Sequence, residues 1–242
     1  MTDWRTTLIL LAKELLVRSP LRKYVLPRYT YNFTAAQLAF LCACLDQTRD
    51  VPGNIVEVGV AGGETTLFLN NYLEAEGINK EYIAVDTFAG FISTDIQFEV
   101  TQRGKEGSHY FGVEGFQINK QSWYDLTMRI NRVTRVRSIQ ADVNQFDLRT
   151  LGAISFCLLD VDLYRPMKKA LRESYEVLSV GGVIVADDCS LNDARFDGSL
   201  QAYQEFMREI GKPEEIVYGK LGVVKKLDER NDKELVHAQS ED

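Results

Sequence analysis

The stretch Asn54-Ile-Val-Glu-Val-Gly-Val-Ala-Gly-Gly-Glu-Thr-Thr66 decides the fold. Its β-branched residues Ile55, Val56 and Val58 suit a strand that is buried on both faces of a parallel sheet. Glycines follow, and the apolar residues after them have helical spacing. A strand, a glycine turn and a helix expose backbone N–H groups and let a nucleotide-like ligand approach the main chain. The stretch therefore predicts a ligand-binding βα unit.

The spacing of the glycines limits the classes of ligand that the loop could bind. Gly59, Gly62 and Gly63 run G-x-x-G-G, which does not meet the G-x-G-x-x-G pattern of dinucleotide-binding folds. Glu57 stands two positions before Gly59, where it would repel a pyrophosphate and would suit a cationic or hydroxyl-bearing ligand. The alternative is a glycine turn that only closes a βα unit.

Composition and charge exclude several classes of protein. The chain has 242 residues, enough for one domain with an extension, and its net charge of −7 argues against nucleic acid or an anionic membrane as the main partner. No apolar stretch reaches the ~20 residues that span a bilayer. The start Thr2-Asp-Trp-Arg5 lacks the features of a signal peptide, and the four cysteines have no disulfide or metal spacing. We expect a cytoplasmic protein.

Hydrophobic periodicity outlines the domains. Helices over 4–18 and from the capping residue Thr34 predict an N-terminal helical extension over 1–50, whose apolar stripes favour a homo-oligomer. The main domain is expected over 51–227 and a flexible polar tail over 228–242. Residues 88–125 are irregular and aromatic, which is typical of a lid or substrate loop. His109 in this loop is either a bystander or a base.

Strands and helices alternate through the main domain. This pattern predicts a mostly parallel sheet with helices on both faces. We expect strands at 54–58, 82–86, 133–139, 154–159 and 183–186, and a closing antiparallel pair at 216–218 and 221–224. Helices are expected after the glycines, over 167–178 after the fourth strand, and over 198–210, with a turn at 179–182.

Two acidic residues follow the second and third predicted strands. Asp86 ends the strand 82–86, where a carboxylate can accept both hydroxyls of a ribose, although such an Asp can also cap a helix. Asp142 follows the third strand and is either a group facing an adenine or a turn residue.

Four further carboxylates end two consecutive strands, at Asp160, Asp162, Asp187 and Asp188. If these strands are neighbours, the carboxylates converge and raise one another's pKa unless a cation compensates. Hard oxygen ligands suit Mg²⁺, which leaves positions for substrate oxygens. The alternatives are that Asp162 caps the following helix and that one residue of the Asp187-Asp188 pair faces water.

Several motifs over residues 50–226 together resemble a known family. They are Glu57-Val-Gly-Val-Ala-Gly-Gly63, Asp86, Leu159-Asp-Val-Asp-Leu-Tyr164, Leu178-Ser-Val-Gly-Gly182 and Asp187-Asp188. This set is similar to the macrocin O-methyltransferase group, class I S-adenosylmethionine enzymes that methylate sugar hydroxyls with Mg²⁺.

The resemblance assigns a role to each motif. It implies that Glu57 and the loop Gly59–Gly63, with Val60 and Thr65, hold the methionine portion of S-adenosylmethionine. It implies that Asp86 holds the ribose and that Asp142 lies near the adenine. It further implies that Asp160, Asp187 and Asp188 ligate the metal, so that Asp160 acts in catalysis through the metal, and that Asp162 is the general base.

We therefore expect an α/β protein with a Rossmann-like class I methyltransferase fold and a seven-stranded, mostly parallel sheet. The expected function is Mg²⁺-dependent O-methyl transfer from S-adenosylmethionine to a hydroxyl of a small molecule, a sugar of a natural-product glycoside. Two alternatives stay open: a nucleotide-sugar glycosyltransferase, because Asp160-Val-Asp162 fits a D-x-D metal motif, and a non-catalytic S-adenosylmethionine-binding protein.

Overall fold

The computed structural model describes residues 4–20, 31–110, 116–192 and 195–228. The chain divides into two units, residues 1–32 and residues 33–242. The first unit contains α1 (Trp4–Val17), which confirms the helix predicted over 4–18. Every helix in the described ranges is too short or too polar to cross a membrane.

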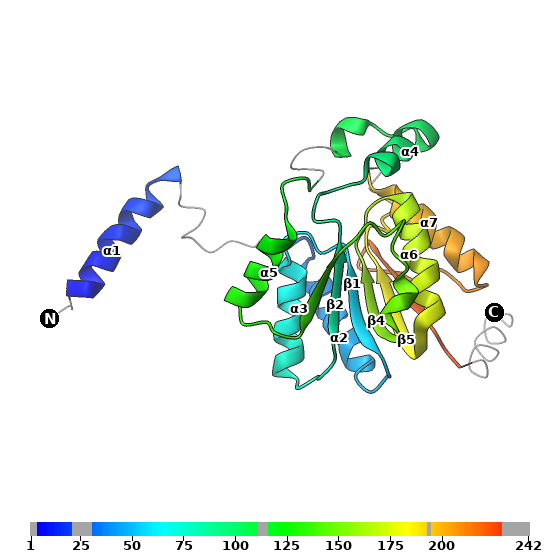
Figure 1. Cartoon of the computed structure of the whole chain (residues 1–242), viewed down its shortest axis with the longest axis horizontal. Helices are drawn as coiled ribbons and strands as arrows, with labels where there is room; N and C mark the ends of the chain where they lie inside the picture. Colours follow the sequence, from blue (N-terminus) through cyan, green and yellow to red (C-terminus); the bar gives the residue numbers. More distant parts are fainter. Residues whose placement is uncertain (1–3, 21–30, 111–115, 193–194, 229–242) are drawn as a thin grey trace. The chain divides into compact units, whose positions relative to one another are not determined.

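Within the described residues, seven strands form one sheet in the order β3-β2-β1-β4-β5-β7-β6 (Figure 1). Neighbours from β3 to β5 pair in parallel, whereas β7 pairs antiparallel with both β5 and β6. This arrangement confirms the predicted fold class. The strands are β1 (Asn54–Val58), β2 (Tyr82–Asp86), β3 (Val136–Gln140), β4 (Ile154–Leu159), β5 (Leu178–Ala186), β6 (Ile216–Val217) and β7 (Leu221–Lys225).

Helices cover both faces of the sheet, as predicted. On one face, α6 (Tyr164–Val177) and α7 (Asp197–Glu209) pack against each other (Figure 1) and share a core with Val56 and Cys157. Side chains alternate along a strand, so Glu57 points to the opposite face. There it contacts α3 (Glu64–Ala75), and α5 (Gln121–Ile130) packs against Ala84.

The helix α2 (Ala35–Gln47) begins at Thr34, as predicted, because Thr34 and Gln37 form a reciprocal capping box. The Gln37 side chain also donates to the carbonyl of Tyr218 at 3.0 Å, and the Phe40 ring packs 5.5 Å from the Tyr218 ring. These contacts hold α2 against the β6–β7 hairpin.

The prediction that residues 88–125 are irregular is wrong. This segment contains α4 (Ser93–Arg103), the 3₁₀ helix η2 (Gly107–Tyr110) and the first half of α5. Buried ion pairs fix α4: Arg103 binds Glu99 and Asp197, and Glu99 accepts the Tyr164 N–H at 2.8 Å. These partners lie far along the chain, so local periodicity does not reveal the helix. Residues 111–115 lie outside the described ranges.

The turn predicted at 179–182 lies inside β5. Ile154 of β4 pairs with Leu178, but Phe156 pairs with Val183, so the glycine-containing segment is accommodated as an irregularity within the strand. The 3₁₀ helix η3 (Leu148–Leu151) precedes β4. The predicted tail falls almost entirely on residues 229–242, which are outside the described ranges.

Candidate functional site

The first glycine of the β1–α3 loop permits a close backbone contact. Gly59 has a φ of +85°, and a Cβ on it would lie 1.8 Å from the carbonyl oxygen of Asp160. The Asp160 N–H also donates to the Val58 carbonyl at 2.8 Å. Only glycine fits this position. The contact places the glycine loop directly beside the first of the strand-end carboxylates.

Asp86 organises the glycine loop. Its Oδ2 accepts the backbone N–H groups of Val60 and Ala61 at 2.8 and 3.0 Å, and its Oδ1 accepts the Phe88 N–H at 2.6 Å. The Val60 side chain is buried with Phe88, so this residue offers a ligand only its backbone.

The loop ends at the start of α3. Gly63 is the N-cap of this helix in the left-handed conformation, at a φ of +91°. A Cβ on Gly63 would meet the side chains of Met128 and Tyr124, so this glycine, too, allows close packing. Thr65 lies in the first turn and is partly exposed.

Glu57 lies beneath the loop rather than on its surface. Its side chain is 1% exposed and accepts hydrogen bonds from Thr66 Oγ1 at 2.5 Å and from the Tyr82 hydroxyl at 2.6 Å. The Tyr124 hydroxyl donates to Thr66 Oγ1 at 3.2 Å. Burial raises the pKa of Glu57 to about 7, against the two hydrogen bonds, which lower it. A buried carboxylate of this kind attracts a cationic group.

The raised pKa of Glu57 predicts a pH-dependent stability. The stabilising contribution of Glu57 to the free energy of unfolding is fully present below the unfolded-state pKa of 4.5. It is lost as the pH rises through about 7. Glu57→Gln mimics the protonated form, so the free energy of unfolding at pH 8 should rise by about 2–3 kcal/mol relative to wild type. At pH 4.5 the two proteins should differ little. Urea denaturation at both pH values measures this, and Glu14→Gln, at an exposed glutamate of α1, is the control. Parallel pH profiles for wild type and Glu57→Gln would contradict the prediction.

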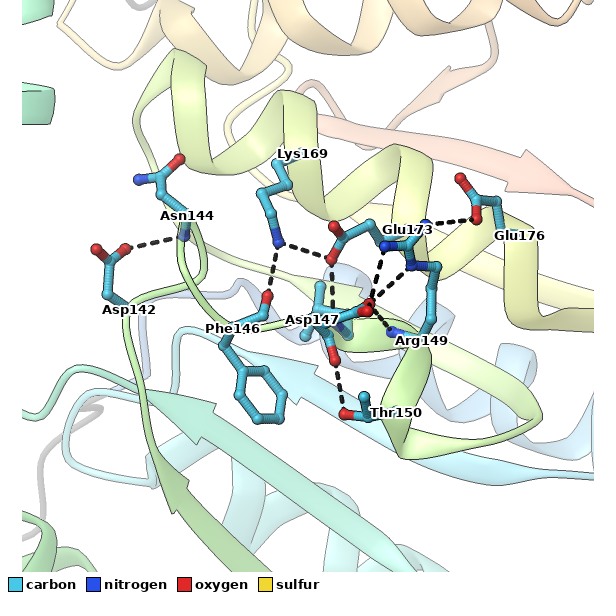
Figure 2. A network of polar contacts seen from close by, with 10 residues as sticks. Asp142, Asn144, Phe146, Asp147, Arg149, Thr150, Lys169, Glu173 and Glu176 are labelled. Carbon is cyan, nitrogen blue, oxygen red and sulfur yellow. Dashed lines mark hydrogen bonds and ion pairs between the residues drawn. The ribbon is translucent and has the colours of Figure 1, made fainter.

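Asp142 lies beside Asp86 at the same edge of the sheet. Gln140 pairs with Asp86 in the β2–β3 ladder, and the Ala141 N–H donates to the Asp86 carbonyl at 2.8 Å. The Asp142 carboxylate accepts the Asn144 N–H at 2.9 Å, as Figure 2 shows. Asp142 thus stabilises its own turn while its side chain stays partly exposed.

A cavity of about 350 Å³ lies along the polar face of α6, bordered by Asn144 and several cations. Figure 2 shows part of its wall, where Lys169 binds Glu173 at 2.7 Å and Arg149 binds both Asp147 and Glu176. Because carboxylates neutralise these cations, we interpret the network as structural and not as an anion site.

The strand-end carboxylates converge, as predicted. Among the described residues, Asp160, Asp187 and Asp188 each present one carboxylate oxygen, and these oxygens all lie within 4.8 Å of one another. Asp187 is 3% exposed, and its Oδ1 accepts no hydrogen bond from any described part of the chain. The cluster is therefore rich in unsatisfied negative charge.

The electrostatics of the cluster reflect this crowding. Burial raises the pKa of Asp160 well above its usual range, and the charges of Asp187 and Asp188 raise it further. Burial does the same for Asp162, together with the charges of Asp160 and Asp188. The pKa of Asp187 is raised to about 6, by burial and by Asp188, while Lys220 opposes the shift. A cation among these carboxylates would oppose the mutual repulsion that raises their pKa values.

Lys220 is a member of the site that the sequence does not reveal. It lies in the turn between β6 and β7, and its Nζ is 2.7 Å from Asp187 Oδ2 and 3.7 Å from Asp188 Oδ1. A lysine after Gly219 in a hairpin turn ordinarily indicates an exposed position, so no local signal marks it.

Backbone strain is concentrated at this edge of the sheet. A non-glycine residue with positive φ follows each of four strands: Ala61 after β1, Phe88 after β2, Asp162 after β4 and Asp188 after β5, at 43°, 50°, 60° and 57°. Such conformations are costly for residues other than glycine and are typical of functional sites.

The strand order places the predicted site residues in one row. Along β3, β2, β1, β4 and β5, the edge carries Asp142, Asp86, the glycine loop, Asp160 with Asp162, and Asp187 with Asp188. The glycine loop and the acidic cluster meet where the backbone of Gly59 lies against the carbonyl of Asp160. His109 has its backbone in η2, but its side chain is outside what the structure describes.

Comparisons with known proteins identify the family of the chain and its fold. A family model described as macrocin O-methyltransferase (TylF) matches residues 25–217. The solved structure of the O-methyltransferase NovP is similar over 79% of each chain, with a TM-score of 0.63 and 17% identity. The calicheamicin methyltransferase CalS11 is similar over 94% of this chain and 95% of its own, with a TM-score of 0.63 and 20% identity.

A more distant likeness links the fold to the cofactor product. The methyltransferase PaMTH1 of Podospora anserina, solved with S-adenosylhomocysteine (SAH) bound, is similar over 91% of this chain and 88% of its own, with a TM-score of 0.52 and 16% identity. A search of curated proteins finds no match. The structural likenesses show the fold, and the family model spans most of the chain. The chain belongs to the macrocin O-methyltransferase family and is an S-adenosylmethionine-dependent O-methyltransferase.

Proposed function

We propose that the protein methylates a hydroxyl of a small molecule, a sugar of a natural-product glycoside, with Mg²⁺ held by Asp160, Asp187 and Asp188. The observation that carries the proposal is the convergence of these carboxylates beside the glycine loop. The same edge of the sheet thus offers a place for the methyl donor and a place for a cation that holds the acceptor.

The cluster fits a divalent cation on its own chemistry. Three carboxylates supply the hard oxygen ligands that Mg²⁺ prefers, and the buried Asp187 Oδ1 has no hydrogen-bond partner among the described residues. When bound, such an ion would hold the acceptor hydroxyl and lower its pKa.

The cofactor residues support a position for each part of S-adenosylmethionine. Asp86 uses Oδ2 to order the N–H groups of Val60 and Ala61, and the remaining lone pair of its Oδ1 would accept a ribose hydroxyl. Glu57, with the loop from Gly59 through Val60 to Gly63 and Thr65 at the helix start, would receive the cationic methionine portion. The neighbouring Asp142 would lie at the adenine.

Asp162 is the proposed general base. It is partly buried beside Asp160 and Asp188, and its raised pKa gives it a high proton affinity. In the reaction, the acceptor oxygen forms a bond to the methyl carbon as the carbon–sulfur bond breaks, and the hydroxyl proton passes to Asp162. S-adenosylhomocysteine, the methyl ether and a protonated Asp162 are the products, and solvent then takes the proton.

Aromatic and apolar side chains beside this base support a sugar acceptor. Leu163 packs with Tyr110 and Phe196, and the rings of Phe91 and Phe116 meet at 5.6 Å on the same cluster. Within this group Phe91 is partly exposed and Phe116 is exposed, and such rings suit the apolar C–H faces of sugars. CalS11 is described as a TDP-rhamnose 3'-O-methyltransferase, which favours the same acceptor class here. Residues 88–125 would cover the acceptor.

Calorimetric titration tests the proposal. S-adenosylmethionine should bind wild type and Asp187→Asn with similar affinity, whereas Mg²⁺ should bind only wild type. Methyl transfer to hydroxylated glycosides should then require Mg²⁺. Failure to bind S-adenosylmethionine would overturn the proposal and favour the alternative of a nucleotide-sugar glycosyltransferase. Binding of S-adenosylmethionine without turnover on any hydroxylated acceptor would favour a non-catalytic binding protein. Turnover without a metal would contradict the proposed dependence on Mg²⁺.

We further propose that the protein forms a homo-oligomer through residues 1–50. The described side chains of α1 expose apolar surface on several sides of the helix, at Trp4, Leu8, Ile9, Leu11 and Leu15. Exposed apolar surface of this extent is typical of an interaction site. Light scattering should give a multiple of 27.5 kDa for the full chain and a smaller mass for a Leu8→Glu/Leu15→Glu variant. A monomeric wild type would contradict the proposal.

A further inference from the structure

The reversed direction of β7 brings a lysine to the acidic cluster. Gly222 of β7 pairs antiparallel with Ala186, the residue before Asp187, so the turn that precedes β7 lies at the carboxyl end of β5. The Cys189 N–H donates to the Lys220 carbonyl at 2.8 Å and fixes the turn against the strand end. The backbone therefore directs residue 220 to the cluster.

The Lys220 ammonium is enclosed by carboxylates and an aromatic ring. Its Nζ bonds Asp187 Oδ2 at 2.7 Å, lies 3.7 Å from Asp188 Oδ1 and stands 4.7 Å from the centre of the Phe33 ring. The side chain is 21% exposed, and Phe33 is fully buried. The side chain is held as a cation.

We propose that Lys220 is a tethered counter-cation, which neutralises the acidic cluster when no metal is bound and competes with the metal for Asp187 and Asp188. This inference rests on the metal site of the proposed function. Crowded carboxylates repel one another unless a positive charge lies among them. The ammonium touches two of the three metal-ligand residues, so it stabilises the metal-free protein and opposes the approach of a divalent cation.

Two substitutions separate the charge of Lys220 from its hydrogen bond. Lys220→Met removes both, whereas Lys220→Gln removes the charge and keeps an N–H donor for Asp187. Lys225→Met is the matched control, because Lys225 lies on the same hairpin and pairs with the half-exposed Glu215. If Lys220 only oriented Asp187, Lys220→Met would bind metal more weakly and Lys220→Gln would resemble wild type.

The experiment measures Mn²⁺ affinity by electron paramagnetic resonance, and thermal stability in EDTA and in Mg²⁺. We expect both Lys220 variants to bind Mn²⁺ at least about tenfold more tightly than wild type. In EDTA their Tm should fall by about 5 °C or more, and Mg²⁺ should restore it. Lys225→Met should match wild type in both measurements.

Unchanged or weaker Mn²⁺ binding by both Lys220 variants, with wild type binding normally, would overturn the role of Lys220 alone. Absence of Mn²⁺ binding in every protein, with S-adenosylmethionine still bound, would reject the metal site and the competition together. Should Lys220→Met fail to fold, the double variant Lys220→Met/Asp187→Asn removes the unpaired charge and should fold. A double variant no more stable than Lys220→Met would also overturn the inference.

Discussion

Replacing Asp162 with asparagine is expected to lower kcat for methyl transfer by about 10²–10⁴-fold, the usual contribution of a general base. Asparagine has nearly the same shape, but it cannot accept the proton of the acceptor hydroxyl. Asp162 has a φ of +60°, a conformation that asparagine tolerates well. The variant should therefore fold normally and fail in chemistry.

Single-turnover methyl transfer measures the rate of this variant, and calorimetry measures its affinity for S-adenosylmethionine, which we expect to stay within about twofold of wild type. Asp147→Asn is the control, because Asp147 pairs with Arg149 at the surface, outside the acidic cluster. If kcat of Asp162→Asn stayed within about tenfold of wild type, a different group would be the base.

The second large effect is expected at Gly59. Gly59→Ala places a Cβ 1.8 Å from the Asp160 carbonyl oxygen, at a φ of +85°. Both strands that meet there are buried, so neither backbone can move away without disturbing the core. We expect a loss of at least about 4 kcal/mol in the free energy of unfolding, or no folded protein.

Gly77→Ala separates the two causes of this loss. Gly77 also has a positive φ, +64°, but its Cβ would meet nothing within 4 Å. It should therefore show only the backbone cost of about 1 kcal/mol. Urea denaturation of both variants measures the difference, which reports the contact between the glycine loop and Asp160. Equal losses in the free energy of unfolding for the two variants would show that the close contact does not contribute to stability.

The central sheet could be predicted because its signals are local. The strands at 54–58, 82–86 and 154–159 have the predicted bounds, since each is a short buried run that ends in a turn or an acid. The row of site residues followed from the same reasoning, because parallel strands end at one edge. The order of these residues along the edge could not be predicted, because it depends on the order of the strands in the sheet.

The parts that could not be predicted depend on distant contacts. The helix α4 is polar, and Glu99 and Arg103 within it are buried only because they pair with each other and with groups of α6 and α7. Gly181 indicated a turn, yet hydrogen bonds of Gly181 and Gly182 to Lys226, distant in sequence, hold this segment within the strand. Lys220 lies next to the cluster because β7 runs antiparallel, and its sequence neighbours carry no trace of that.

The four left-handed residues at the strand ends have a consequence for protein engineering. A search for thermostabilising substitutions that ranks positions by backbone strain would include Ala61, Phe88, Asp162 and Asp188, because glycine or asparagine relieves such strain. Asp162 and Asp188 supply the proposed chemistry, and Phe88 and Ala61 donate the backbone N–H groups that hold Asp86. Glycine or asparagine keeps those N–H groups but removes the carboxylates, so a more heat-resistant variant obtained at Asp162 or Asp188 would lose turnover.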